Sequence, residues 1–490
     1  MFCAAAGNFA QSSPSPAHGG QLAPRARPGA GSTGAGRGSC AMGAQEPRSG
    51  PAPSPPAPPL HAAASYNDLR GPAARPGSPA PDAPGAPPPL FSFGLAADVQ
   101  HADIDDGASF KGVPRYYRGA LDVLDRAVDA WDAAGVDFAV HLGDIVDGYN
   151  PKDASEAALR SVLDRFGRLG RPHYHLLGNH CLYNLPRARL NEALGIEGLL
   201  PGPGECEEGD RASFYSFSPH PGFRFVALDA YAVSVLGWPA TDARRVLAER
   251  LLRENNPNAR AGNPNSPDGL EGPARRFVQF GGGLGEAQLQ WLASPPPAAP
   301  ARTPAGLPSP RRPLRARSLR ARSLRARSLR ARSLRARSLR ARSLRPLAPS
   351  SPVPESQDRE LAGARERGEV ALVACHLPVH PGAAFPTCLL WDYEECLAVI
   401  ARHPGTVALT LAGHMHRDGD CVGEDGTHHR VVHGVIETPP GEDCHAVVEV
   451  HRDHILIRGH GRVASQRVPF TAPAALAAGG GGPGPRRGPA

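Results

Sequence analysis

The chain has 490 residues, and its 56 glycines and 55 prolines indicate that low-complexity sequence takes up much of this length. It contains no run of 18 apolar residues, so no membrane-spanning helix is expected, and we recognise no signal peptide. The nine cysteines are scattered without Cys-x-x-Cys spacing, which favours free thiols in a reducing compartment.

Residues 1–88 are rich in Pro, Ala, Gly and Ser and contain scarcely an apolar run, so we expect a disordered tail. Within it, residues 1–45 carry three arginines and no acidic residue, a faint similarity to a mitochondrial transit peptide. Pro14, Pro16, Pro24 and Pro28 would break the amphipathic helix that such a peptide needs. We therefore expect a cytoplasmic protein, with the mitochondrion as the alternative.

Five short apolar runs read as buried strands, and each ends in polar residues. The runs and the polar residues after them are 92–97 with Asp98-Val99-Gln100, 138–142 with Gly143 to Gly148, 173–177 with Gly178-Asn179-His180, 370–375 with His376, and 407–412 with Gly413-His414-Met415-His416. Helical spacing over 119–134, 154–169 and 392–402 makes these runs parts of β-α-β units. Ligands bind at the carboxyl ends of strands in open α/β sheets, so we expect these side chains to meet.

Seven of these residues have side chains that can bind a metal: Asp98, Gln100, Asp144, Asn179, His376, His414 and His416. Spacing of i, i+2 puts Asp98 and Gln100, and likewise His414 and His416, on one face of an extended chain. A single structural zinc ion uses about four ligands. Seven ligands therefore predict two ions that share a carboxylate.

The order of the five blocks resembles the calcineurin-like metallophosphoesterase superfamily. The residues Ala97 to Asp103, Gly143 to Gly148, His376-Leu377-Pro378, Gly413 to His416 and Gly434-Val435-Ile436-Glu437-Thr438 resemble one branch, the manganese-dependent ADP-ribose/CDP-alcohol diphosphatases. The resemblance covers roughly residues 90–469. It implies an α/β protein with a four-layer α/β/β/α sandwich.

The resemblance also implies the chemistry. Asp98, Gln100 and His416 would bind one ion, Asn179, His376 and His414 the other, and Asp144 would bridge them. His180, oriented by Asp147, would act as general acid or charge stabiliser at the leaving oxygen. The implied reaction splits ADP-ribose into AMP and ribose 5-phosphate, or CDP-choline, CDP-ethanolamine and CDP-glycerol into CMP and the phospho-alcohol.

Gln100 stands where the broad superfamily usually has His, and the branch resembled has the same Gln. An amide binds transition metals less well than an imidazole. We therefore expect two divalent ions per chain, manganese or magnesium in preference to zinc.

Three residues are candidates for the substrate pocket. Phe110 could stack on a base, Arg115 (or Arg118) could meet a phosphate, and Cys388 lies in an irregular stretch twelve residues past His376. Phe110 and Cys388 are equally plausible as core packing, and the acids that precede Phe110 in the loop, Asp103, Asp105 and Asp106, could form a solvated turn and helix cap.

Residues 294–357 interrupt the resemblance with six copies of Leu-Arg-Ala-Arg-Ser, from Leu314 to Ser343. A period of five matches neither a helix nor a strand, so the repeat cannot form a core element. Residues 301–350 contain 16 arginines and no acid. The formal net charge of the whole chain is +7, so the residues outside this segment have a net charge of 7 − 16 = −9. The repeat could bind RNA, but we favour a neutral insertion into a surface loop.

The expected domains are therefore the tail 1–88, a metallophosphoesterase domain in two parts, 89–293 and 358–470, the insertion 294–357 between them, and a second tail 471–490. Within the domain we expect a hairpin of strands 214–217 and 223–228, helices over 241–252 and from 286, and strands at 431–436, 446–451 and 455–458. We expect a monomer that acts on small nucleotides and binds neither membrane nor, outside the repeat, nucleic acid. The alternative function is another metallophosphoesterase activity, on a phosphodiester or a phosphoprotein.

Overall fold

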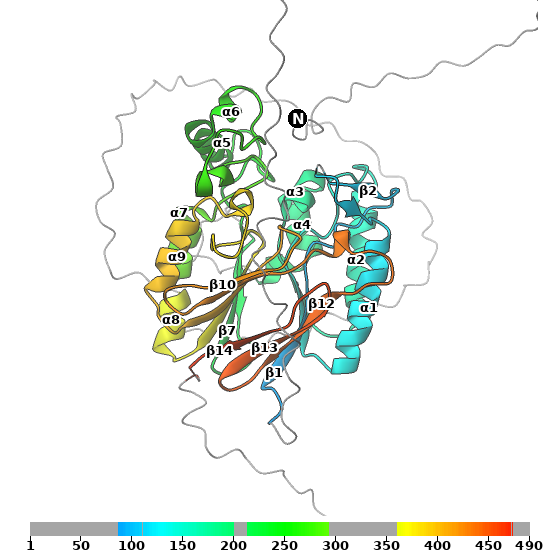
Figure 1. Ribbon diagram of the computed structural model, residues 1–490, viewed down its shortest axis with the longest axis vertical. Coiled ribbons are helices and arrows are strands. Elements are labelled where there is room, and N and C mark those ends of the chain that lie inside the picture. Colours follow the sequence, from blue (N-terminus) through cyan, green and yellow to red (C-terminus); the bar gives the residue numbers. More distant parts are fainter. Residues whose placement is uncertain (1–86, 110, 200–212, 294–359, 472, 474–490) are drawn as a thin grey trace, which may run out of the picture. The chain divides into compact units, whose positions relative to one another are not determined.

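Two sheets of six strands each form the centre of the molecule, and helices cover their outer faces (Figure 1). The computed structural model describes residues 87–109, 111–199, 213–293, 360–471 and 473. Almost all of the predicted tails, the whole insertion and Phe110 lie outside these residues. The arrangement confirms the predicted α/β/β/α sandwich.

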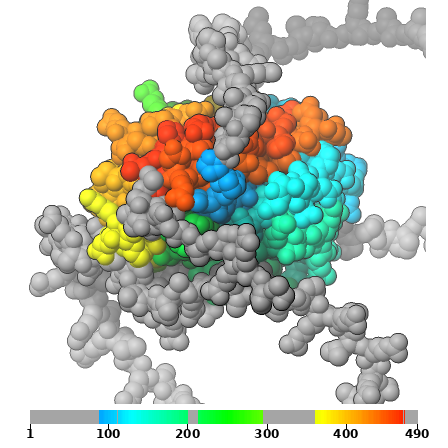
Figure 2. Space-filling model, turned by 90° about the horizontal axis from the view of Figure 1, so that it is seen from below, coloured from blue at the N-terminus to red at the C-terminus, as the bar shows by residue number. Residues whose placement is uncertain are grey.

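The first sheet joins the beginning of the described chain to its end. Its strands lie in the order β14 (Gln466–Pro469), β13 (His454–Gly461), β12 (Cys444–Val450), β1 (Phe91–Ala96), β4 (Phe138–His141) and β5 (His173–His175). Strands β1, β4 and β5 are parallel, while β12 pairs antiparallel with β1. Figure 2 shows this seam, with the blue start of β1 beside the orange and red C-terminal strands.

The second sheet has the order β10 (Gly419–Val422), β11 (His428–Val431), β9 (Val407–Ala412), β8 (Val370–Cys375), β7 (Phe223–Leu228) and β6 (Tyr215–Phe217). Strands β11, β9, β8 and β7 are parallel, and β6 and β7 form the predicted hairpin. The carboxyl ends of β8 and β9 therefore lie side by side, as do those of β1, β4 and β5 in the first sheet.

The predicted strand 431–436 is wrong. The strand there, β11, ends at Val431, and Val435–Glu437 form a 3₁₀ helix, η4. The reason is a different backbone pairing: the N–H groups of Val435 and Ile436 donate to the carbonyl oxygens of Ala97 and Asp98, each at 3.0 Å. This contact brings η4 against the loop after β1 instead of into a sheet.

Aromatic side chains fill the space between the sheets. Phe93 of β1 lies 5.1 Å from the Phe138 ring and 6.0 Å from the Phe225 ring of β7, centroid to centroid. Successive strand residues face opposite ways, so Gly94 faces outward, where a Cβ atom would lie 2.3 Å from Cδ2 of Trp131 in the covering helix. Phe93 of β1 thus contributes to the core between the sheets, while Gly94 on the opposite face leaves room for Trp131 of the covering helix.

Helices α1 (Gly119–Ala134) and α2 (Ser155–Arg168) cover the first sheet, and α7 (Gly285–Ala293), α8 (Glu360–Glu366) and α9 (Tyr393–Ala401) cover the second (Figure 1). Helices α5 (Ala243–Asn255) and α6 (Pro257–Arg260) lie together at one end of the fold (Figure 1), and the 3₁₀ helix η2 (Gly272–Arg276) follows them in the chain. Among the described residues no helix is long and apolar enough to cross a membrane.

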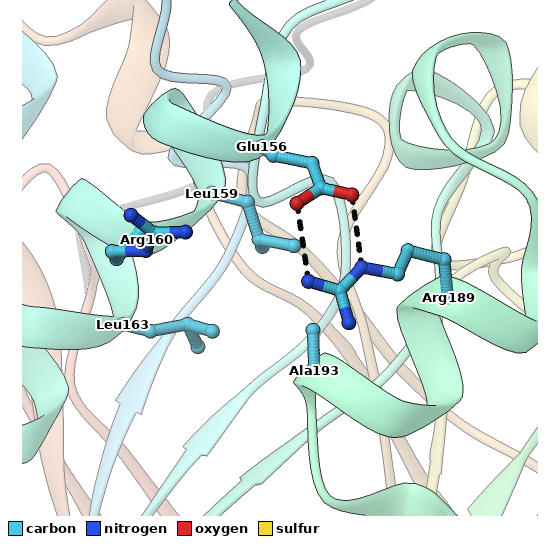
Figure 3. A pocket seen from close by; sticks show the side chains of 6 residues that line it. All are labelled: Glu156, Leu159, Arg160, Leu163, Arg189 and Ala193. Atoms are coloured by element: carbon cyan, nitrogen blue, oxygen red, sulfur yellow. Dashed lines mark hydrogen bonds and ion pairs between the residues drawn. The ribbon is translucent and has the colours of Figure 1, made fainter. Parts of the chain in front are cut away.

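Helices α3 (Asn179–Asn184), α4 (Arg187–Ala193) and η1 (Ile196–Gly198) follow β5. A shallow groove between α2 and α4 is bridged by Arg189, whose guanidinium donates to both carboxylate oxygens of Glu156 at 2.9 and 3.1 Å (Figure 3). On the other side of the molecule, α7 packs against α8. The helices that come before and after the insertion in the sequence are therefore neighbours in the structure.

Candidate metal centre

The loops after β1, β4, β5, β8 and β9 carry the seven predicted ligands at the carboxyl ends of these strands. Six of these residues are at most 5% exposed, and His414 is partly exposed. Such burial of carboxylates and imidazoles is costly unless the groups are paired or bind a metal.

Asp144 lies at the centre of the cluster. Its Oδ2 atom is 3.4 Å from Nε2 of His376 and accepts a hydrogen bond from Nε2 of Gln100 at 3.2 Å. The potential ligand atoms of Asp144, His376 and His414 all lie within 4.8 Å of one another. Gln100 Nε2 is also 2.9 Å from Nε2 of His416, which links the two sides of the cluster.

Asp98 and Asn179 complete the set. Nε2 of His416 lies 3.4 Å from Oδ1 of Asp98, whose carboxylate also accepts the backbone N–H of His414 at 2.9 Å. The Asn179 amide is held by two tyrosines: Tyr231 OH donates to its Oδ1 at 3.1 Å, and its Nδ2 donates to Tyr183 OH at 3.3 Å. The structure therefore brings the five predicted loops to one place.

The donor set suits hard or borderline divalent cations. Carboxylate, amide and imidazole groups are ligands for manganese, magnesium and zinc. Nε2 of His376 is buried beside Oδ2 of Asp144 and makes no hydrogen bond to any described residue, the state expected of a nitrogen that coordinates an ion. Gln100 faces the cluster with Nε2, while its Oε1 accepts from Arg115 at 3.2 Å. An amide must present its oxygen to a cation, so metal binding at Gln100 requires this amide to turn over.

The backbone at the cluster is strained. Five predicted ligands have positive φ angles: Asp98 (52°), Gln100 (43°), Asp144 (58°), His414 (66°) and His416 (58°). The left-handed region is unfavourable for residues other than glycine, at about 1–3 kcal/mol each. All five positive angles of non-glycine residues in the described chain fall on this one site. Strain concentrated in this way is typical of functional sites.

Glycines let the loops approach one another. A Cβ atom on Gly178 would lie 2.0 Å from Oδ1 of Asp144, and one on Gly413 would lie 2.6 Å from Oδ2 of Asp98. The glycines in the motifs Gly178-Asn179-His180 and Gly413-His414-Met415-His416 therefore leave room for the carboxylates of neighbouring motifs.

Burial and neighbouring charges set the protonation of the cluster. Burial raises the pKa of Asp98 and Asp144, but the charges of His416 and His376 outweigh burial and hold both pKa values below the usual value. Burial lowers the pKa of His416, yet Asp98 and Glu437 raise it to about 9. Burial, aided by His376, lowers the pKa of His414 to about 3. The carboxylates are thus ionised at neutral pH, as cation binding requires.

His180 lies beside this cluster and is held by Asp147. The Nδ1 atom of His180 is 3.1 Å from Oδ2 of Asp147, and the backbone N–H of Gly148 also approaches Nδ1 at 3.0 Å. The Gly148 contact suits an unprotonated Nδ1 and the Asp147 contact a protonated one. The buried carboxylate of Asp147 favours a proton on Nδ1, because a charged acceptor forms the stronger hydrogen bond. The backbone N–H of His180 donates to Oδ1 of Asp144 at 2.8 Å, which fixes the loop to the cluster.

The predicted substrate-pocket residues differ in where they lie. Arg115 is close to the cluster, with NH1 at 3.2 Å from Oε1 of Gln100 and 3.4 Å from Oδ2 of Asp147. Cys388 is partly buried at η3 (Pro386–Cys388). Burial raises the pKa of its thiol to about 11, so the thiol is neutral. Phe110 lies outside the described residues, and its stacking role stays a prediction.

Two residues that touch the cluster were missed by the sequence analysis. Oε1 of Glu437 lies 3.1 Å from Nδ1 of His416, and the Tyr231 hydroxyl donates to Oδ1 of Asn179. Glu437 carries a detectable signal, a lone acid in the apolar motif Gly434 to Thr438. Tyr231 carries none, because it lies in a loop between apolar residues.

The fold and the cluster define a calcineurin-like phosphoesterase, and the family model described as Calcineurin-like phosphoesterase matches residues 91–258. The chain is 38% identical over 383 residues to a manganese-dependent ADP-ribose/CDP-alcohol diphosphatase of Oryza sativa, covering 78% of this chain and 95% of the relative. It is 33% identical over 383 residues to the human protein of that name, covering 76% of this chain and 91% of the relative. The chain belongs to the family of manganese-dependent ADP-ribose/CDP-alcohol diphosphatases.

A solved structure agrees with this family. A dimetal phosphatase from Danio rerio superposes with a TM-score of 0.61 at 32% identity, covering 78% of this chain and 100% of that chain. The family and the fold indicated by the sequence motifs are thereby confirmed.

Proposed function

We propose that this protein is a metal-dependent hydrolase of pyrophosphate bonds. It would convert ADP-ribose to AMP and ribose 5-phosphate, and CDP-choline, CDP-ethanolamine and CDP-glycerol to CMP and the phospho-alcohol. The observation that carries the proposal is the convergence of seven donor side chains beside His180 in a chain 38% identical to a relative named for these activities.

Two divalent ions would occupy the cluster, manganese or magnesium in preference to zinc. Asp98, Gln100 and His416 would hold one ion and Asn179, His376 and His414 the other, with Asp144 between them. Two bound cations would supply water activation and neutralise the phosphoryl oxygens during in-line displacement. The contacts of Asp144 with both Gln100 and His376 support its central place.

The protein's own groups would handle the leaving oxygen. His180, aligned by Asp147, would donate a proton to that oxygen or stabilise its charge. Arg115 would keep Asp147 in position through its contact with Oδ2 of that residue, and its contact with a substrate phosphate stays a prediction.

Further proposals concern the protein as a whole. We infer a cytoplasmic monomer that acts on small nucleotides, with no nucleic-acid partner outside the Arg-rich repeat. The domain boundaries proposed are those inferred from the sequence: tails 1–88 and 471–490, and a catalytic domain of residues 89–293 and 358–470 separated by the insertion 294–357.

Product analysis tests the proposed reaction. The full chain with manganese is incubated separately with ADP-ribose and CDP-choline, and products are separated by ion-exchange chromatography. We expect AMP with ribose 5-phosphate from the first, and CMP with phosphocholine from the second. Release of inorganic phosphate from a phosphopeptide, with no AMP from ADP-ribose, would establish the alternative phosphatase function instead.

Replacing Glu437 tests the assignment of His416 as a ligand. Glu437→Ala removes the carboxylate that faces Nδ1 of His416, and loss of such a partner weakens metal binding by about 10- to 100-fold. We expect this weaker binding to appear in a manganese titration in which enzyme activity is measured at each metal concentration. Glu437→Gln keeps an acceptor oxygen and should lose less. Unchanged manganese affinity in Glu437→Ala would contradict the role of Glu437.

A further inference from the structure

Tyr231 is a fully buried tyrosine in the loop after β7, next to the metal centre. Its hydroxyl donates to Oδ1 of Asn179 at 3.1 Å, and its ring centroid lies 6.0 Å from that of His376. Asn179 and His376 are two of the three residues proposed to hold the same ion. Tyr231 therefore lies beside one of the two proposed ion sites.

A buried ion pair fixes the backbone of Tyr231. Oδ1 of Asp229 accepts the Tyr231 N–H at 2.9 Å, and NH2 of Arg187 donates to the Tyr231 carbonyl oxygen at 2.8 Å. Arg187 and Asp229 pair with each other and are at most 4% exposed. Nε1 of Trp238 donates to the same carbonyl oxygen at 3.1 Å. Both polar groups of the Tyr231 backbone are therefore bound, which limits how far the side chain can move.

Asp229 is itself held by two other parts of the fold. The backbone N–H of Ser213, just before β6, donates to Oδ2 of Asp229 at 2.8 Å. Gln288 of α7 binds the Asp229 backbone in both directions: Oε1 accepts its N–H at 2.8 Å, and Nε2 donates to its carbonyl oxygen at 2.9 Å. Because Arg187 belongs to α4, the loop that carries Tyr231 is tied to α4, to α7 and to the start of the β6–β7 hairpin.

An asparagine ligand has to present the correct end of its amide. The two ends have nearly the same size, but only the oxygen can bind a cation. At Asn179 the Tyr231 hydroxyl donates to Oδ1, while Nδ2 donates to the Tyr183 hydroxyl at 3.3 Å. An amide oxygen has two lone pairs, so Oδ1 can accept from Tyr231 and still bind an ion. The amide of Gln100, in contrast, faces the cluster with its nitrogen.

We infer that Tyr231 is a positioning residue of the metal centre, whose hydroxyl keeps the oxygen end of the Asn179 amide available to the ion that His376 and His414 would also hold. The inference rests on the proposed function, because it takes Asn179 as a ligand of this ion. It also gives the Arg187–Asp229 ion pair a role, which is to hold Tyr231 in place. Since Tyr231 acts through Asn179, its effect should fall on the affinity for one ion.

Manganese binding by Tyr231→Phe tests the inference, because this change removes the hydroxyl and keeps the ring. The full chain is dialysed to equilibrium against graded manganese concentrations, and the bound metal is measured by elemental analysis. Loss of a group that orients a metal ligand weakens binding by about 10- to 100-fold. We expect this loss for one ion, while the affinity for the other stays within about twofold of the wild-type value.

Tyr215→Phe is the matched control. Tyr215 is also buried, and its hydroxyl donates to the backbone carbonyl oxygen of His175 at 3.0 Å. Each variant loses one buried hydrogen bond, so the melting temperatures of the metal-free chains should fall by similar amounts. Only Tyr231→Phe should lose manganese affinity. Equal losses of manganese affinity in the two variants, or unchanged binding in Tyr231→Phe, would overturn the inference.

Asn179→Asp provides a second test. Both ends of a carboxylate are oxygens, so no hydroxyl is needed to choose between them. Adding Tyr231→Phe to Asn179→Asp should therefore weaken manganese binding by a smaller factor than Tyr231→Phe does alone. An equal factor would show that the hydroxyl does not act by orienting the amide. Metal binding is measured without substrate, so wild-type turnover of ADP-ribose tests the proposed reaction separately.

Discussion

The Asp144→Asn variant is expected to lose about a thousandfold in kcat, equivalent to about 4 kcal/mol of transition-state stabilisation. Asparagine has nearly the same shape, so the buried site can keep its packing. It lacks the negative charge that faces His376 and would be shared by two ions. We also expect a lower manganese content per chain, measured by elemental analysis after dialysis.

The control for Asp144→Asn is a variant that loses a carboxylate outside the metal centre. Asp129→Asn removes a mostly exposed carboxylate of α1 that pairs with Arg168, and surface changes of this kind have small effects. Both metal content and activity should stay at wild-type values. If Asp144→Asn retained two ions and full turnover, the bridging role would be wrong.

The His180→Ala variant is expected to lower kcat by about 10²- to 10⁴-fold without loss of metal, since general acid catalysis contributes this much. His180 contacts Asp147 through Nδ1 and is not one of the seven proposed ligands. Manganese content should therefore stay at the wild-type value. The kinetic assay uses ADP-ribose as substrate.

Asp147→Asn provides a graded comparison for His180. It removes the charge that aligns the imidazole and keeps the imidazole itself, so its loss of kcat should be smaller than that of His180→Ala. The double variant should be little worse than His180→Ala alone, because the two residues act as a unit. A fully additive loss would show that Asp147 acts independently of His180.

Much of the site could be predicted because the ligand residues directly follow apolar runs that are recognisable as strands. Runs such as 138–142 and 370–375 are continuous in apolar character and end in Asp144 and His376 within a few residues. Parallel strands bring their carboxyl ends to one edge, so local patterns sufficed to place these side chains together. Helix α1 was equally readable, since its buried residues recur at helical spacing and the chain turns at Gly135.

Other features depend on contacts that no local pattern encodes. The η4 segment reads as a strand, but its backbone pairs with the loop after β1. A contact between Lys111 and Phe385 joins residues far apart in the sequence. The contact of Gln100 with His416 also joins residues far apart in the sequence. Each is decided by tertiary neighbours.

The pairing of β1 with β12 has a consequence for synthesis of the protein. The first strand of the described chain has its antiparallel neighbour at Cys444–Val450, and His376, His414 and His416 also come from the later part of the sequence. A nascent chain therefore cannot complete its first sheet or its ion-binding pocket until nearly the whole catalytic region has left the ribosome. Premature termination before β12 would yield an inactive polypeptide rather than a weaker enzyme.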